Sequence, residues 1–215
     1  MDVIALDCNG VLMNSIPKTI ETGIEWLEKF FNVKIEKKKL EDMVLYFSGG
    51  TFSEGFRKVL ESLFPGGYDE EIVKRGSQEL LEKMEKIYKE AEPFPNVIEV
   101  LRRLAKNYHL VISSGLERIY LEEWLRKLGV LDVFEVIYSG EDGGKGIHLQ
   151  LIRAKYPGAK IFYVADSLSE MKLGDFPIGV AKNPWHQEVL LRGGAQVVIS
   201  SFDKLSNALT YSKRH

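Results

Sequence analysis

The sequence predicts an α/β protein with a parallel sheet, helices on both faces of that sheet, and an inserted α-helical cap domain. Short apolar runs recur along the chain and alternate with amphipathic helical patterns, which is typical of a parallel sheet covered on both faces. A block of consecutive helical patterns follows the first apolar run and interrupts the alternation. Parallel sheets bind ligands at the carboxyl ends of their strands, so functional residues are expected where the apolar runs end.

Six apolar runs have the length and composition of buried strands. They are Val3–Leu6, Leu110–Ile112, Val133–Tyr138, Ile161–Ala165, Ile178–Ala181 and Val197–Ile199. Between them, apolar side chains repeat every three or four residues, which indicates helices with one buried face. These helices are expected at Val97–Asn107, Arg118–Leu128 and His148–Lys155.

The interrupting block contains four amphipathic helical patterns separated by glycine-rich turn signals. The patterns are Lys18–Phe31, Lys38–Tyr46, Phe52–Leu63 and Tyr68–Lys89. We therefore expect a sheet domain formed by residues 1–15 and 93–215, and a helical cap domain formed by residues 16–92. The hinges between the two domains are expected near Ser15–Lys18 and Glu92–Asn96.

The composition argues against several classes of protein. The 215 residues include 29 basic and 31 acidic side chains, a net charge of −2, so bulk charge favours neither nucleic acid nor an anionic membrane as a partner. No apolar run approaches the roughly 20 residues of a membrane span. The first strand is expected to begin at residue 3, which leaves no room for a signal peptide before it. We expect a cytoplasmic protein, either a monomer or a small homo-oligomer.

Polar residues follow the ends of several predicted strands. Asp7 follows the first strand, Ser113 the second and Asp166 the fourth, while Lys145 lies in the glycine-rich stretch after the third. In a parallel sheet all four meet at one edge. They suit a phosphate ester, because they provide a carboxylate nucleophile, a hydroxyl donor, a cation and a second carboxylate. Asp7 and Asp166 could share one Mg²⁺, an ion that prefers oxygen ligands.

The sequence resembles the haloacid dehalogenase (HAD) superfamily nearly from end to end. "LDCNGVL" is similar to the first motif of that family, an Asp-x-Asp-Gly loop, and "VISS" is similar to the second. Lys145 matches the third motif, and "ADSLSEM" resembles the fourth. The helical block lies where many members of the family carry a cap, between the first and second motifs. Four motifs in this order form a specific pattern.

The resemblance implies a Rossmann-like core, a Mg²⁺ cofactor, a small phosphorylated metabolite as substrate, and a role for each matched residue. Asp7 is then the nucleophile, with Asp166 and the backbone carbonyl of Asn9 beside it around the metal. Ser113 and Lys145 would hold the phosphoryl group. The other candidates are Ser114, the backbone amides of Cys8 and Asn9, Ser167 and Glu170 beside the metal ligands, and Ser48, Thr51 and Arg57 in the cap.

Asn9 departs from the pattern of the family's phosphatases, which carry a second aspartate at this position. That acid protonates the leaving oxygen and then activates water, whereas an amide has no titratable proton. Metal binding should survive, since the backbone carbonyl remains. Three interpretations stay open: a weakened Mg²⁺-dependent phosphatase, a metal-free dehalogenase that cleaves carbon–halogen bonds, and a catalytically silent protein that binds a phosphate ligand.

Other reactive or aromatic side chains are interpreted as structural. Cys8 continues the alternation of the first strand and is expected to be a small packing residue, since no activating histidine is evident beside it. We expect His148 and His186 at the surface or in loops. Trp26 and Trp124 fall on apolar helix faces and are expected in the core.

Overall fold

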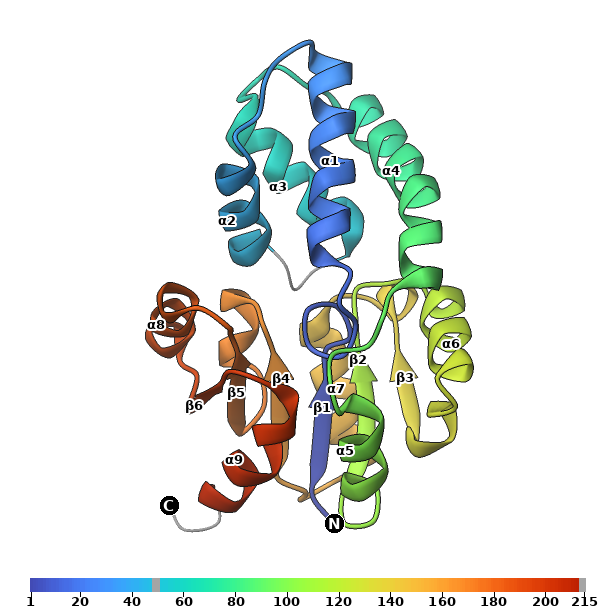
Figure 1. The fold of residues 1–215 in the computed structure, drawn as a ribbon, viewed down its shortest axis with the longest axis vertical. Helices are drawn as coiled ribbons and strands as arrows, with labels where there is room; N and C mark the ends of the chain where they lie inside the picture. The colour runs from blue at the N-terminus through green and yellow to red at the C-terminus, as the bar shows by residue number, and fades with distance from the viewer. Residues whose placement is uncertain (48–50, 213–215) are drawn as a thin grey trace.

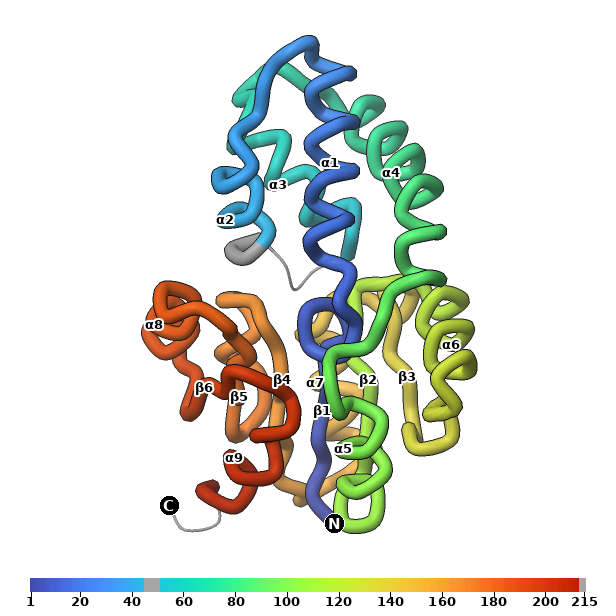
Figure 2. The backbone as a smooth tube through the Cα atoms, in the orientation of Figure 1, coloured from blue at the N-terminus to red at the C-terminus, as the bar shows by residue number. Residues whose placement is uncertain are grey.

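The computed structural model describes residues 1–47 and 51–212 (Figures 1 and 2). Within these residues all strands form one parallel sheet of six strands in the order β3-β2-β1-β4-β5-β6. The strands are β1 (Val3–Leu6), β2 (His109–Ser113), β3 (Val136–Tyr138), β4 (Ile161–Ala165), β5 (Phe176–Val180) and β6 (Val197–Ile199). The predicted α/β fold with a parallel sheet and an inserted helical cap is confirmed.

The first strand lies in the middle of the sheet and is completely buried. Leu6 pairs with Ile112 of β2 on one side and with Val164 of β4 on the other. All four residues of β1 are buried, as expected for a strand covered on both faces. This register places the residues that follow β1, β2 and β4 at one edge of the sheet, where the resemblance puts the catalytic groups.

Helices cover both faces of the sheet. One face, which carries Ile4 and Leu6, is covered by α5 (Val97–Leu104), α6 (Arg118–Lys127) and α9 (Leu205–Tyr211). The other face, which carries Val3 and Ala5, is covered by α7 (Lys145–Lys155) and α8 (Pro184–Gly193). Short 3₁₀ turns are η1 (Leu131–Val133), η2 (Gly140–Asp142), η3 (Leu168–Lys172) and η4 (Phe202–Lys204).

Several predicted boundaries shift, two of them by three residues at the start of an element, and α5 ends at Leu104 instead of Asn107. The third strand begins at Val136 instead of Val133, because residues 131–133 form the turn η1. Helix α7 begins at Lys145, three residues before the predicted start.

The cap consists of α1 (Ile16–Phe31), α2 (Lys37–Phe47), α3 (Phe52–Leu63) and α4 (Glu70–Glu90), all inserted between β1 and β2. Figure 1 shows it above the carboxyl ends of the strands. Trp26 stacks on Phe30 and meets Phe56 edge-on. Gly76 allows this approach, since an added Cβ would lie 2.7 Å from both Trp26 and Phe56. Trp26 and Trp124 are both buried, as predicted.

Two adjacent linkers connect the cap to the sheet domain, one before α1 and one after α4, and Figure 2 shows them side by side. The amide of Asn14 donates to the carbonyl of Glu92 (3.0 Å), and the amide of Phe94 donates to the carbonyl of Leu12 (2.9 Å). One continuous apolar cluster extends from the face of the sheet under α5 and α6 into the cap. Among the described helices, none combines the length and apolar character that a membrane span requires.

Candidate active site

The carboxylate of Asp7 lies at the end of the central strand and is only 4% exposed. The amide of Cys8 donates to its Oδ1 at 2.7 Å. The ammonium group of Lys145 lies 2.9 Å from its Oδ2. One backbone donor and one cation therefore fix both oxygens of this carboxylate at the edge of the sheet.

Lys145 is the first residue of α7 and is 3% exposed. Its Nζ contacts Asp7 and also lies 2.5 Å from Oε1 of Glu170. Burial alone would lower the pKa of Lys145, but the negative charges of Asp7 and Glu170 raise it above its ordinary value. Lys145 therefore stays charged between two carboxylates.

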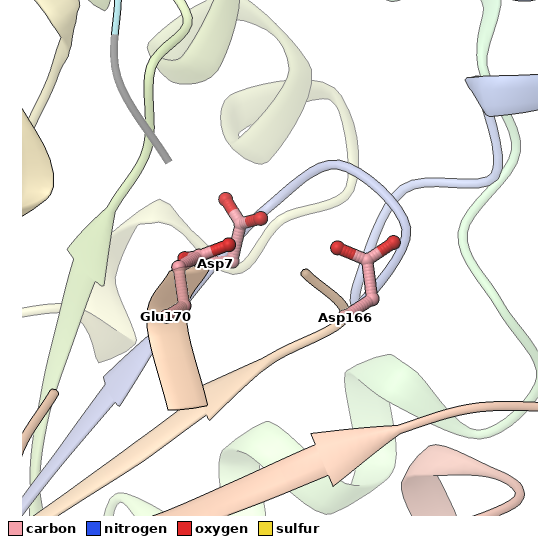
Figure 3. A group of neighbouring side chains, drawn as sticks. All are labelled: Asp7, Asp166 and Glu170. Atoms are coloured by element: carbon pink, nitrogen blue, oxygen red, sulfur yellow. The ribbon is translucent and has the colours of Figure 1, made fainter. Parts of the chain in front are cut away.

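Asp166 follows β4, and Glu170 lies in the turn η3 that comes next. Carboxylate oxygens of Asp7, Asp166 and Glu170 lie within 4.8 Å of one another (Figure 3). Glu170 is fully buried, and its other oxygen accepts a hydrogen bond from the hydroxyl of Ser167. Burial and the repulsion between these acids raise the pKa of Asp166 and that of Glu170. A site with more carboxylates than cations favours a bound metal ion.

Gly10 makes this arrangement possible. Its φ is +78°, in the left-handed region that favours glycine, and a Cβ at this position would lie 1.9 Å from Oδ2 of Asp166. The loop around it is closed by amides of Leu12 and Met13, which both donate to the carbonyl of Cys8. A glycine at this position therefore lets the loop after β1 approach the carboxylate after β4.

Asn9 lies in the same loop and lines the cavity that contains Asp7, Lys145 and Asp166. Its side-chain oxygen accepts a hydrogen bond from the hydroxyl of Ser15, at the start of the cap. Ser15 consequently makes no side-chain cap on α1. With the carbonyl group held in this way, the NH₂ group is the part of Asn9 that can donate to a ligand.

The two serines after β2 occupy different environments. Ser114 lines the cavity beside Asp7, whereas Ser113 is fully buried behind it. The Ser113 hydroxyl lies 2.7 Å from the hydroxyl of Tyr163 and 2.9 Å from Nδ1 of His148. Because successive side chains of a strand point to opposite faces, a shift of one position decides which hydroxyl reaches the cavity.

The three candidate substrate-binding residues of the cap also differ in position. Thr51 lines the cavity and caps α3 through a reciprocal pair of bonds with Glu54. Arg57 lies outside that cavity, where it forms an ion pair with Glu70 of α4. Ser48 lies outside the described residues.

The histidines differ from the prediction in one case. The expectation of a surface or loop position is wrong for His148, which is fully buried and bridges Ser113 to the carbonyl of Ser139 (2.9 Å from Nε2). The sequence does contain a signal for this burial: His148 lies three residues after Lys145 and four before Ile152, so the three side chains share one helix face. His186 is partly buried, and its Nε2 lies 2.7 Å from the backbone carbonyl of Asp166.

Cys8 is fully buried, as its packing interpretation requires. Burial and the nearby charge of Asp7 raise the pKa of its thiol, so the thiol stays protonated and cannot serve as a thiolate nucleophile. The structure therefore gives Cys8 a packing role and excludes its thiol as a nucleophile.

Comparison with known proteins identifies the family. The model of the haloacid dehalogenase-like hydrolases matches residues 4–175, the segment that holds all the residues of this cavity. The chain belongs to the haloacid dehalogenase-like hydrolases. No curated protein matches the sequence significantly.

Solved structures of haloacid dehalogenase-like proteins share the fold over their full length. A predicted phosphatase from Clostridium acetobutylicum superposes with a TM-score of 0.77 at 16% identity, covering 98% of each chain. A conserved haloacid dehalogenase-like protein of unknown function from Agrobacterium tumefaciens gives 0.72 at 23% identity, covering 99% of each chain. A predicted phosphoglycolate phosphatase from Haemophilus somnus gives 0.74 at 16% identity, over 97% of this chain and 98% of its own.

Proposed function

We propose that this hydrolase is a Mg²⁺-dependent phosphatase that cleaves small phosphate monoesters through a covalent aspartyl-phosphate at Asp7. The observation that carries the proposal is the convergence of three carboxylates and one buried ammonium group, of which Asp7, Asp166 and Lys145 line a single cavity. Two of the similar solved structures are described as predicted phosphatases, which agrees with this proposal.

The acidic cluster fits a small dication with oxygen ligands. Its three donors are all carboxylates, the ligand type that Mg²⁺ prefers. Asp7 and Asp166 would hold the ion together with the backbone carbonyl of Asn9. Glu170 accepts hydrogen bonds from Lys145 and Ser167 and would orient the site beside these ligands. When bound, the ion would neutralise part of the charge on the phosphoryl group.

Asp7 performs the first step. An oxygen of its carboxylate forms a bond to phosphorus while the bond from phosphorus to the leaving oxygen breaks. In the second step a water attacks the phosphorus of the aspartyl-phosphate, and the bond from phosphorus to the Asp7 oxygen breaks, which releases phosphate and restores the carboxylate. The leaving alkoxide takes its proton from solvent, and the attacking water returns one to solvent. Lys145 holds positive charge beside the nucleophile throughout, and the amide of Cys8 keeps the carboxylate aimed.

Ser114 and Asn9 complete the phosphoryl site in this proposal. Ser114 lines the cavity and Ser113 does not, so we assign the phosphate contact to Ser114. The NH₂ group of Asn9 can donate a hydrogen bond to the leaving oxygen but cannot transfer a proton. We therefore expect slow turnover of esters whose leaving alkoxide needs protonation.

The charge of the site separates this function from metal-free dehalogenation. Asp7, Asp166 and Glu170 face a single ammonium group, that of Lys145, among the described residues of the cluster. Without a metal ion, such an acidic site would repel the carboxylate of a 2-haloacid, whereas a bound metal ion would let it hold a phosphate. The dehalogenase interpretation thus has no specific support in this geometry.

The test is a panel of alkyl and aryl phosphates assayed with Mg²⁺ and with a chelator. We expect Mg²⁺-dependent phosphate release that Asp7→Asn abolishes and that Asp132→Asn, at an exposed aspartate in η1, leaves intact. Halide release from 2-chloropropionate without Mg²⁺ would contradict the proposal. So would turnover of phosphate esters by Asp7→Asn.

Metal binding can be measured apart from turnover. Calorimetric titration should show one Mg²⁺ per chain, with at least ~10-fold weaker binding in Asp166→Asn, since metal ligands typically contribute at least that much. A Mg²⁺ affinity that does not change in Asp166→Asn or Asp166→Ala would exclude this residue as a ligand.

A further inference from the structure

The cavity that contains Asp7 extends from the edge of the sheet into the interior of the cap. Its volume is about 210 Å³. All four cap helices contribute apolar side chains to its wall, which include Ile20 and Leu27 of α1, Leu40 of α2, Phe56 and Val59 of α3, and Leu80 of α4. The charged residues of the described wall are Asp7, Lys145 and Asp166, and all three belong to the sheet domain.

The described cap wall offers few polar side chains, and each of them already makes one hydrogen bond within the protein. The hydroxyl of Thr19 donates to the carbonyl of Ile16 at 2.9 Å, and that of Thr51 accepts from the amide of Glu54. The hydroxyl of Tyr88, 2% exposed, meets the sulfur of Met84 at 3.4 Å. In the described part of the wall, a ligand rich in hydroxyl groups would therefore lose its bonds to water without gaining equivalent partners.

We propose that the group attached to the phosphate of the natural substrate is apolar, a ring or branched chain of five to eight carbons, seated in the cap cavity. This inference rests on the proposed phosphatase function, because it takes the phosphoryl group to lie at Asp7. A cavity of about 150 Å³ with apolar walls holds benzene, so the space above Asp7 accommodates a ring of this size. The protein then selects its substrate by exclusion of hydroxylated groups.

A matched pair of esters tests the proposal. Cyclohexylmethyl phosphate and glucose 6-phosphate both carry the phosphate on a CH₂ group attached to a six-membered ring, so their leaving oxygens are comparable. We expect kcat/KM for cyclohexylmethyl phosphate to exceed that for glucose 6-phosphate by at least ~100-fold, since unpaired polar groups in a binding site produce discrimination of this order or more. Equal or higher activity on glucose 6-phosphate would overturn the inference and leave the phosphatase function standing.

Gly23 provides a variant that fills the cavity from the side of the cap. It lies on α1 in the cavity wall, and an added Cβ would have only Leu40 near it, at 3.7 Å. Gly23→Leu should lower the ratio of kcat/KM for cyclohexylmethyl phosphate to that for acetyl phosphate by at least ~10-fold, and Gly23→Ala should lower it less. Lys58→Leu adds an apolar side chain at an exposed position of α3 and should leave the ratio unchanged.

Binding of a stable analogue separates this inference from the reaction. Calorimetry should show that cyclohexylmethylphosphonate binds at least ~10-fold more tightly than inorganic phosphate, and that Gly23→Leu removes the difference. If the analogue binds in this way and no ester is hydrolysed, the apolar site stands and the phosphatase function fails. If the two ligands bind equally, the inference fails whatever the turnover. Gly23→Ala decides the question if Gly23→Leu does not fold.

Discussion

Asn9 connects the catalytic loop to the start of the cap through one hydrogen bond. Its side-chain oxygen accepts from Ser15, the residue directly before α1, and Asn9 lines the cavity together with Asp7. A carboxylate at position 9 would accept the same bond from Ser15 and would have a second oxygen to carry a proton. The present residue therefore keeps the geometry of the loop and lacks only the proton.

Asn9→Asp should raise kcat/KM for an alkyl phosphate by ~10²–10⁴-fold, the usual contribution of general acid–base catalysis. The gain should be smaller for an aryl phosphate, because a phenolate leaves without much help. The measurement is kcat/KM for both esters in the original chain and in Asn9→Asp. If the substitution adds nothing for alkyl phosphates while Asp7→Asn abolishes turnover, another group supplies the proton.

His148 should make stability depend on pH. Burial lowers its pKa, so the folded protein keeps this side chain neutral at a pH where the unfolded chain, with a pKa of about 6.5, binds a proton. Stability is therefore lost as the pH falls below about 6.5, by up to ~1.4 kcal/mol per pH unit for one proton. Urea unfolding between pH 7.5 and 5.5 should show a smaller decrease in His148→Gln.

The comparison at pH 7.5 serves as the control in this experiment, because His148 is neutral there in both states and the difference measures packing alone. Burial also lowers the pKa of His186, so part of the pH dependence should persist in His148→Gln. If the free energy of unfolding falls by the same amount in the original chain and in His148→Gln, His148 does not contribute to the pH dependence.

Individual side-chain positions were less predictable than residue types. The sequence indicated a serine at the end of β2, but whether Ser113 or Ser114 reaches the cavity depends on where the strand ends, and an error of one residue reverses the face. This one-residue ambiguity does not affect Asp7, Lys145 and Asp166, because each belongs to a motif whose spacing sets its place. Arg57 appeared as a cap candidate, yet its guanidinium turns outward to Glu70.

The loop between β1 and the cap is the element on which the proposed metal site depends. It must pass within van der Waals distance of Asp166, and Gly10 is the point of contact. Gly10→Ala should weaken Mg²⁺ binding at least ~10-fold and lower the free energy of unfolding by ~1–2 kcal/mol, the usual cost of a left-handed alanine. Calorimetry and urea unfolding measure the two effects.

Gly146→Ala is the matched control, because an added Cβ there meets no atom within 4 Å and alanine favours a helix. This variant should unfold at the same or a higher urea concentration. Undiminished Mg²⁺ affinity in Gly10→Ala would mean that the carboxylate of Asp166 moves aside without loss, and the close approach would have no functional value.

Elements with a strong hydrophobic period were predictable from the sequence. Helix α3 was predicted with its observed bounds from its amphipathic pattern and the flanking glycine-rich turn signals, and the structure adds a capping box of Thr51 and Glu54 at its start. The start of β3 was not, because the apolar residues Leu131 and Val133 fit a turn as well as a strand. The walls of the cap cavity were also missed, because an apolar helix face looks the same in the sequence whether it packs fully or leaves a cavity.

For the whole molecule, the arrangement of cap and sheet domain determines access to Asp7. The cavity is enclosed by both parts, so we expect the cap to open about its linkers for substrate exchange. Lys38 of α2 places its ammonium group 4.4 Å from the ring centroid of Trp185 in α8, a contact between cap and sheet domain. This cation–π pair should favour the closed arrangement.

Lys38→Met keeps the side-chain stem and removes the charge. It should shift the ratio of closed to open forms about two- to fivefold toward the open form, since such pairs contribute ~0.5–1 kcal/mol at exposed sites. Small-angle scattering should detect a larger radius of gyration, and a tight phosphate mimic should reverse it. Lys39→Met, at the next exposed lysine, should change nothing. Identical profiles with and without the mimic would contradict the motion.

The hydrogen bonds between the two linkers also bear on how the chain folds. β1 and β2 are neighbours in the sheet, although the entire cap lies between them in the sequence. Suppose that the cap helices pack first and that the hydrogen bonds of Asn14 and Phe94 hold the two linkers together. The flexible loop between β1 and β2 then consists only of the linkers and α5. A roughly fourfold shorter effective loop lowers the entropic barrier to this pairing by about 1 kcal/mol. The cap, which separates β1 from β2 in the sequence, would then bring these two strands together during folding.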